Sequence, residues 1–288
     1  MFPWFQWTTI QFGPISIQVW GLLVALGIII SLIILRQFSP HFGFRSEEVF
    51  DLAFWMILFG FFIARIFHVF LYEPGWYLAN PIEIIKVWHG GFSSFGGFLG
   101  AILAFFFYSR RTKWKKERRK MADLFAFAGL FGWIIGRVGC VMIHDHLGRS
   151  SDYFFALNSP LGPRLDMALL EIIGLLPLAI LFFAMRKKDK VAGWFLSVLF
   201  LYYGILRFIL DFFRATDIAS ADVRYFGLTP AQYFAIVMTA VGAWFFLRKL
   251  PKKWRIFVIT ILALILCSLG IWWYVEWKTV CGNCGSMF

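Results

Sequence analysis

Three arginines stand inside long apolar stretches of the chain: Arg65, Arg137 and Arg207. An arginine at the centre of a membrane helix costs roughly 2.5–3.5 kcal/mol on insertion scales, so each one needs water, an acidic partner or an anionic ligand. The planar guanidinium binds phosphate oxygens in pairs. We therefore expect an anion site, with a lipid phosphate as its natural anion. The alternative is a buried ion pair that only fixes helix packing.

Acidic residues near the ends of the same stretches could pair with these arginines. The candidates are Asp145, Glu171 and Asp211. Arg207 and Asp211 are four residues apart, so they share one face of a helix.

Two histidines flank an aspartate in the sequence His144-Asp145-His146. A neutral imidazole polarised by a carboxylate could accept a proton. The alternative is a pair of interfacial histidines that hydrogen-bond water. A zinc site would lack a third and fourth ligand, because His68 and His89 lie in other segments. We expect neither a metal nor a cofactor.

Four cysteines are too few for a disulfide scaffold. Cys140 and Cys267 are expected to pack in apolar surroundings. Cys281 and Cys284 form a CxxC pair, for which a structural disulfide or no function is expected.

A glycine-rich stretch occupies residues 89–100. Gly96 and Gly100 have the GxxxG spacing that is typical of helix packing. The paired glycines on either side of two serines permit positive φ and predict a turn that presents backbone N–H groups. The candidate residues of this turn are Gly90, Gly91, Ser93, Ser94, Gly96 and Gly97.

The composition indicates what must position these groups. The chain has 288 residues, of which 60% are hydrophobic and 15% charged, against about 45–50% and 25% in soluble domains. This excludes disorder and a water-soluble globule. The net charge of +12 comes from short basic runs between apolar stretches, so we expect no nucleic-acid partner.

The fold is predicted to be all-α, a polytopic membrane bundle. Each span needs roughly 20 apolar residues, and the runs that qualify are 15–36, 51–72, 94–109, 121–143, 167–185, 192–213, 231–247 and 256–275. We assign residues 1–250 to a transmembrane catalytic domain with seven spans. Residues 251–288 are assigned to an extra span and a short extracytoplasmic tail.

The distribution of Lys and Arg predicts the orientation. The loops after the first, third, fifth and seventh spans hold 19 of the 28 basic residues, so they should face the cytoplasm. Both termini and the loops at 73–93, 144–166 and 214–230 should then face outward. The N-terminus has no basic n-region or cleavage site, so we expect the first span to be retained.

Six motifs in this order resemble the prolipoprotein diacylglyceryl transferase family over roughly residues 10–247. They are Gly13–Ile17, Arg65, the Gly90–Gly100 stretch, the Gly136–Arg149 segment, Arg207–Arg214 and Leu228–Gln232. The departures from the family pattern are Phe95 for a histidine, Cys140 for an asparagine, Asp145 and Asp211 for glutamates, and Trp20 for a tyrosine.

The resemblance implies a reaction in which phosphatidylglycerol and the lipobox cysteine of a prolipoprotein signal peptide give a diacylglyceryl thioether and glycerol-1-phosphate. It implies residence in the bacterial inner membrane, among membrane lipids, with the site toward the extracytoplasmic side. Arg137 and Arg207 would hold the phosphate and Asp211 would orient Arg207. His144, Asp145 or His146 would promote deprotonation of the thiol. The expected substrate-binding residues are Arg65, Gly90, Gly91, Ser93, Ser94, Gly96, Gly97, Gly139, Arg149 and Arg214.

A transporter or flippase for an anionic lipid or metabolite is the alternative function, because the same arginines would serve it. Such proteins usually show an internal repeat, and the glycine-rich and 136–149 segments each occur once.

Overall fold

The computed structural model describes residues 1–248 except 14, 88–89, 112, 189 and 219–221. Most of this part is helical. The long helices are α1 (Val19–Phe38), α2 (Ser46–Phe67), α4 (Ser94–Arg111), α5 (Arg118–Ile143), α6 (Met167–Met185), α7 (Trp194–Leu210) and α8 (Pro230–Leu247). The predicted span at 256–275, the assignment of residues 251–288, and Cys267, Cys281 and Cys284 lie outside the described residues.

The described helices are those of a multi-pass membrane protein. Six of them are long and apolar enough to cross a membrane, and α4 is a shorter apolar helix. The seven predicted spans up to residue 247 all coincide with these helices. The first prediction began too early, because residues 15–18 form a strand and α1 begins at Val19.

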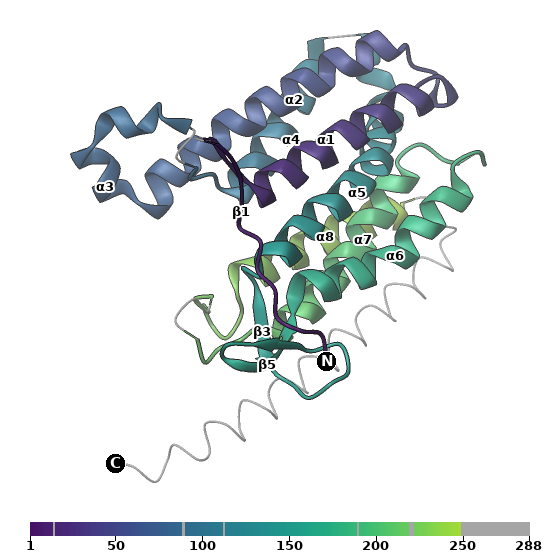
Figure 1. Cartoon of the computed structure of the whole chain (residues 1–288). Helices are drawn as coiled ribbons and strands as arrows, with labels where there is room; N and C mark the ends of the chain where they lie inside the picture. Colours follow the sequence, from purple (N-terminus) through teal and green to yellow (C-terminus); the bar gives the residue numbers. More distant parts are fainter. Residues whose placement is uncertain (14, 88–89, 112, 189, 219–221, 249–288) are drawn as a thin grey trace.

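The two ends of the helical bundle differ. Short connections, such as the 3₁₀ turns η1 (Pro40–Phe42) and η5 (Lys113–Lys116), join helices at one end. Longer segments gather at the other end, where a π-turn (His68–Tyr72), α3 (Pro74–Ala79) and η3 (Pro81–Ile84) project as an arm (Figure 1). The described parts of the basic runs expected to face the cytoplasm belong to the end with the short connections.

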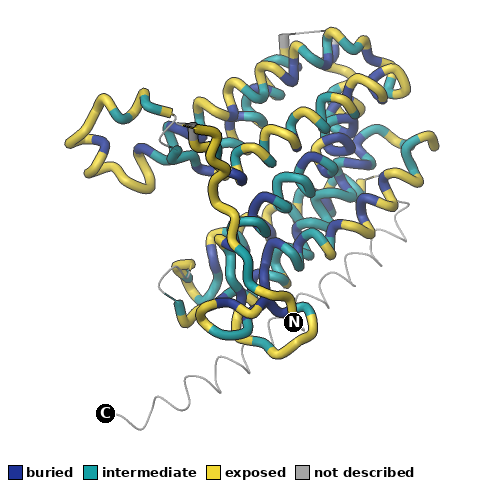
Figure 2. The backbone as a smooth tube through the Cα atoms, in the orientation of Figure 1, coloured by how far each residue is buried: buried dark blue, intermediate teal, exposed yellow. Residues whose placement is uncertain are grey.

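Glycines allow close packing in the helix pairs α1–α5 and α2–α4. A Cβ added to Gly100 would lie 2.3 Å from the carbonyl oxygen of Phe59, and one added to Gly27 would lie 2.5 Å from that of Gly132. Small residues at such crossings let two backbones approach where lipid supplies no hydrophobic drive. The core centres on α5, and many large apolar residues of the surrounding helices are exposed. Figure 2 shows where buried and exposed residues lie along the chain.

Two small sheets lie outside the helices, and the sequence did not indicate them. β1 (Thr9–Phe12) pairs antiparallel with β2 (Ile15–Gln18). The second sheet has the order β3-β5-β4, from Leu147–Ser150, Gly162–Asp166 and Leu157–Ser159.

The segment before β1 crosses from this second sheet to the end of α5. Phe2 forms a parallel bridge with Leu157. The Gln6 side-chain amide donates to the carbonyl of Ile143, and the Trp7 N–H donates to the carbonyl of Met142. The segment thus ties the sheet to the end of the helix that carries the 136–149 motif.

Candidate functional site

Glu171 on α6 is the centre of the polar cluster inside the bundle. Its side chain is 1% exposed. Oε1 accepts a bond from Arg137 Nε of α5 at 2.8 Å, and Oε2 accepts one from Arg207 Nη1 of α7 at 3.1 Å. One carboxylate therefore joins the two arginines that the sequence predicts for phosphate binding, and it links three spans.

Neutral donors complete the surroundings of this carboxylate. Trp133 Nε1 and the Tyr203 hydroxyl both donate to Oε1, at 3.0 and 2.9 Å. The Arg137 guanidinium also lies 4.7 Å from the centre of the Trp133 ring. A buried carboxylate is tolerated when its lone pairs are this fully used, so these contacts hold Glu171 in place.

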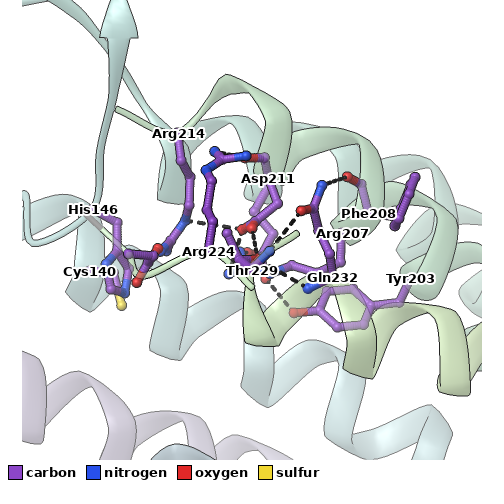
Figure 3. A network of polar contacts seen from close by, with 12 residues as sticks. Cys140, His146, Tyr203, Arg207, Phe208, Asp211, Arg214, Arg224, Thr229 and Gln232 are labelled. Atoms are coloured by element: carbon purple, nitrogen blue, oxygen red, sulfur yellow. Dashed lines mark hydrogen bonds and ion pairs between the residues drawn. The ribbon is translucent and has the colours of Figure 1, made fainter. Parts of the chain in front are cut away.

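Asp211, at the end of α7, forms the second centre of the cluster (Figure 3). Its Oδ1 lies 3.3 Å from Arg207 Nη2 and 3.2 Å from Arg214 Nε. Oδ2 accepts a bond from the Thr229 hydroxyl. Thr229 also caps the N-terminus of α8 in a capping box with Gln232. The predicted contact between Arg207 and Asp211 is present, and it is anchored to the start of α8.

The buried part of the cluster holds more positive than negative charge. Arg137, Arg207 and Arg214 face the two buried carboxylates Glu171 and Asp211. Arg214 also pairs with Asp222, which is 42% exposed at the rim. Burial and the charge of Arg207 lower the pKa of Arg214 to about 10, so it remains charged at neutral pH. A guanidinium has five N–H donors, so the described contacts leave donors for an anion.

His144 turns away from this cluster. It ends α5 in the left-handed conformation, with φ of 50°. Its side chain is 1% exposed, and Nδ1 lies 2.6 Å from Asp166 Oδ2. The rings of Trp4 and Phe5 cover it, with centroids at 4.8 and 4.7 Å. Asp166 Oδ1 also accepts the Leu169 N–H and caps α6. His144 therefore joins the end of α5 to the start of α6.

Asp145 and His146 take a different position, next to Cys140. Figure 3 shows His146 beside Cys140. The ligand atoms of the three side chains lie within 4.8 Å of one another. Arg137 Nη1 is 3.8 Å from the sulfur of Cys140. Cys140 was expected only to pack in apolar surroundings, and the structure adds this polar contact with Arg137.

The pKa values of Asp145 and His146 are shifted in opposite directions. Burial raises the pKa of Asp145 to about 6. Burial and the positive charges of Arg214, Arg137 and Arg207 lower the pKa of His146 to about 3, so its ring is neutral at pH 7.

Arg65, the third arginine, has different partners. It is buried at the end of α2 and donates to five main-chain carbonyls, those of Glu83, Ile84, Lys86, Gly90 and Gly91. Its guanidinium also faces the rings of Tyr77 and Phe92. These contacts commit Arg65 to the loop between α3 and α4, and they argue against its predicted role in substrate binding.

The glycine-rich stretch divides into two parts. Gly90 and Gly91 have φ of 82° and 79°, as the predicted turn requires. Gly96 and Gly97 lie inside α4, so the prediction of a turn there is wrong. A Cβ on Gly96 would lie 2.7 Å from the Ile63 carbonyl oxygen, which makes this glycine part of helix packing.

The two serines of this stretch also differ. Ser93 is buried and its hydroxyl accepts the N–H of Gly96 at 3.4 Å, whereas Ser94 is exposed at the start of α4. Phe95 packs against Phe234 of α8, with ring centroids 5.9 Å apart. An aromatic ring at this position cannot exchange a proton.

Two further predicted substrate-binding residues lie near the cluster. Gly139 faces α1, and a Cβ there would lie 3.2 Å from that of Leu23 and 3.4 Å from the Cα of Trp20. Arg149 on β3 donates to the Phe212 carbonyl and stacks over Phe213. Both contacts position α5 and the end of α7 and give no direct sign of a ligand.

Several residues of the site were missed as site residues. Glu171 was named only as one possible partner, and Thr229 and Gln232 only as part of the Leu228–Gln232 motif. The others were not singled out: Trp133, Asp166, Tyr203 and Asp222. A glutamate within a strongly apolar run was the one available signal, because such a residue requires a partner.

Comparisons with known proteins agree with the motif order. The sequence model of the prolipoprotein diacylglyceryl transferase family matches residues 8–248. Three similar proteins are each named phosphatidylglycerol–prolipoprotein diacylglyceryl transferase. That of Azoarcus sp. (strain BH72) is 31% identical over 83% of this chain and 93% of its own length. That of Methylibium petroleiphilum is 33% identical, over 83% and 94%. That of Photobacterium profundum is 32% identical, over 84% and 92%. None of these matches supports the transporter alternative.

Proposed function

Because the chain belongs to the prolipoprotein diacylglyceryl transferase family, we propose that it moves a diacylglyceryl group from phosphatidylglycerol to the lipobox cysteine of a prolipoprotein signal peptide. The observation that carries this proposal is the pair Arg137 and Arg207 on one buried carboxylate, Glu171. Residues 1–250 hold the whole activity.

The arginines supply what the leaving group needs. The thiolate sulfur attacks the glyceryl carbon that bears the phosphate, the S–C bond forms, and the C–O bond breaks with its electron pair on the phosphate oxygen. Arg137 and Arg207 hold the phosphate through their remaining N–H groups and stabilise the charge that grows on glycerol-1-phosphate. Glu171 and Asp211 hold both guanidiniums in place beforehand, so little reorganisation is needed at the moment of reaction.

Asp145 and His146 are the residues that promote deprotonation of the substrate thiol. Their side chains are 33% and 36% exposed beside Cys140 and Arg137. His144 has no part in this proposal, because it is buried against Trp4 and bonded to Asp166. The thiolate is the nucleophile, so activation of the thiol beside the phosphate-binding arginines brings both reactants to one place.

Other residues bind the remainder of the lipid. Ser94 is open at the start of α4, and Arg214 borders the arginine cluster, so both can contact the glycerol head group. Ser93, the glycines at 90, 91, 96, 97 and 139, Arg65 and Arg149 shape the surroundings through the packing and loop contacts described above.

The membrane placement follows from the two ends of the bundle. The basic connections face the cytoplasm, as the positive-inside rule requires. Asp145, His146 and Arg214 stand at the opposite end, so the site opens toward the extracytoplasmic side of the bacterial inner membrane. Both substrates are anchored in that membrane, which suits a site between spans.

The test is a transfer assay with the purified protein, phosphatidylglycerol and a lipobox peptide that contains one cysteine. We expect the peptide mass to rise by one diacylglyceryl unit. A Cys→Ser peptide is the control and should not change. A peptide that keeps its mass, although the protein is folded and binds phosphatidylglycerol, would contradict the proposed function.

A further inference from the structure

The end of α5 folds back on itself and brings three metal-ligand side chains together. Cys140 lies in the last turn of the helix, and His144 reverses the chain with a φ of 50°. This reversal places Asp145 and His146 beside Cys140, five and six residues later in the sequence. The ligand atoms lie within 4.8 Å of one another, and His146 Nε2 is 3.5 Å from Asp145 Oδ2.

This donor set has the composition of a catalytic zinc site. Ligand atoms around tetrahedral zinc are about 3.3–3.8 Å apart, given bond lengths of about 2.0–2.3 Å. The present spacing reaches this range with small side-chain movements. Thiolate and imidazole ligands select a thiophilic divalent ion over magnesium or calcium. Three protein ligands leave a fourth position open, which distinguishes a catalytic zinc site from a structural one.

We propose that Cys140, Asp145 and His146 bind one zinc ion, and that the open position takes the thiol of the lipobox cysteine. The second half of this statement rests on the proposed function. A thiol that coordinates a metal ion is deprotonated outright, which is the step that the transfer requires.

The charges around the three residues suit such a complex. Zinc with the Cys140 thiolate, the Asp145 carboxylate, neutral His146 and a substrate thiolate carries one net negative charge. The neighbouring cations are Arg137, Arg207 and Arg214. Inside the bundle only the two carboxylates of Glu171 and Asp211 face them, and the third carboxylate, Asp222, is 42% exposed at the rim. A weakly anionic complex fits beside this cluster, and Arg137 already lies 3.8 Å from the Cys140 sulfur.

The chemical step balances without any further reactant. The thiol loses its proton to water as it binds zinc. The zinc-bound sulfur forms the S–C bond to the glyceryl carbon, and the C–O bond breaks with its electron pair on glycerol-1-phosphate. The neutral thioether is a poor ligand and leaves the metal, so the open position is regenerated for the next thiol.

The first experiment measures metal binding without any enzymatic reaction. The full-length protein is loaded with Zn²⁺ or Co²⁺, freed of loose metal by gel filtration, and analysed by elemental mass spectrometry and by absorption. We expect one Cys140-dependent ion per chain and, with cobalt, a thiolate-to-metal charge-transfer band. Cys140→Ser should abolish the band, and His146→Gln should weaken cobalt binding by at least about tenfold.

Matched controls separate this site from the other cysteines. Cys281→Ser/Cys284→Ser should keep the Cys140-dependent ion and its band, which assigns any extra metal to the CxxC pair. Each variant is checked by gel filtration and circular dichroism. The proposal would be overturned if the Cys140→Ser variant is folded and the wild-type protein binds no more metal than this variant does.

The second experiment tests the role of the metal. Addition of the lipobox peptide to the cobalt protein should intensify the charge-transfer band, and the Cys→Ser peptide should not. Chelator-treated protein should lose at least about tenfold in transfer rate and regain it with Zn²⁺. Full transfer by metal-free protein would overturn zinc activation and leave the proposed function intact. A Cys140-dependent cobalt band without any transfer would overturn the proposed function and leave the metal site intact.

Discussion

Arg65 is buried and the pair Arg137 and Arg207 is partly buried at the same end of the bundle, and these arginines are bound in opposite ways. Arg65, in the last turn of α2, donates to main-chain carbonyls of residues 83–91 in the connection between α2 and α4. Arg137 and Arg207 donate to the side chain of Glu171 on another helix. Main-chain partners are fixed by the fold, whereas donors arranged around one carboxylate can also receive a second anion. The partner, more than the burial, therefore indicates whether an arginine holds the fold or holds a ligand.

The largest effect should come from Arg137→Ala. We expect transfer from phosphatidylglycerol to fall by about 10²–10³-fold, because one donor to the developing charge is lost. The protein should still insert and run as wild type in gel filtration, since Glu171 retains Arg207, Trp133 and Tyr203. Arg36→Ala is the matched control. Arg36 lies in the last turn of α1, at the end of the bundle opposite to the site, so this change should leave the transfer rate unchanged. A wild-type rate for Arg137→Ala would remove this residue from the mechanism.

Arg65→Lys should affect order more than chemistry. An ammonium cannot reach five carbonyls as the planar guanidinium does, so we expect a loss of about 1–3 kcal/mol in stability. Protease cleavage between residues 73 and 93 should become faster, and transfer should fall by less than about tenfold. Arg137→Ala serves as the comparison, because its cleavage pattern should match wild type. A loss of transfer without faster cleavage would place Arg65 with the ligand-binding arginines.

His144→Asn should have a smaller effect on the reaction. Asparagine tolerates the left-handed backbone of residue 144, so the change removes the bond to Asp166 without backbone strain. We expect a destabilisation of about 1–3 kcal/mol, seen as a lower melting temperature. The transfer rate below that temperature should change by less than about threefold. His146→Gln, tested in parallel, should lose transfer at an unchanged melting temperature. If instead His144→Asn lost transfer and His146→Gln lowered the melting temperature, His144 would be the residue that serves the reaction and His146 the one that stabilises the fold.

The smallest effect should come from Asp217→Asn, at the surface of the same end. Arg164 of β5 donates to Asp217 and holds the pKa of this carboxyl below its usual value. A lowered pKa stabilises the folded state above the unfolded pKa, near 4, and this stability is lost as the pH falls through the folded pKa. Thermal melts between pH 2 and 5 should show a weaker acid dependence in the variant, with little change at pH 7. Equal pH dependence in both proteins would mean that the pair contributes nothing.

The sequence predicted the membrane helices better than the contacts between them. Apolar runs place a helix along the chain, and α5 was predicted at 121–143 against Arg118–Ile143 in the structure. They do not give the rotation of a helix about its own axis. That rotation brings Glu171 to both arginines, so the central contact of the site could not be predicted from the apolar runs alone.

Local sequence misled in two places for a related reason. Gly96-Gly97 has the composition of a turn, but packing of α4 on α2 makes both residues helical. His144 and His146 look equivalent around Asp145. The positive φ at His144 sends one ring to Asp166 and the other to Cys140. Tertiary packing decides between conformations that a short segment allows equally.

The segment before β1 has a consequence for the order in which the protein forms during synthesis. Phe2 bonds to the main chain of Ala156 and Asn158, and Trp4 and Phe5 cover His144. The ribosome makes this segment long before it makes residues 144–158. This short aromatic segment therefore lacks its partners while the first helices enter the membrane. It closes over the end of α5 only when the later sheet has emerged. Its docking is a late step of assembly. A bulky fusion placed before Phe2 would therefore delay the completion of the site, with less effect on the insertion of the helices.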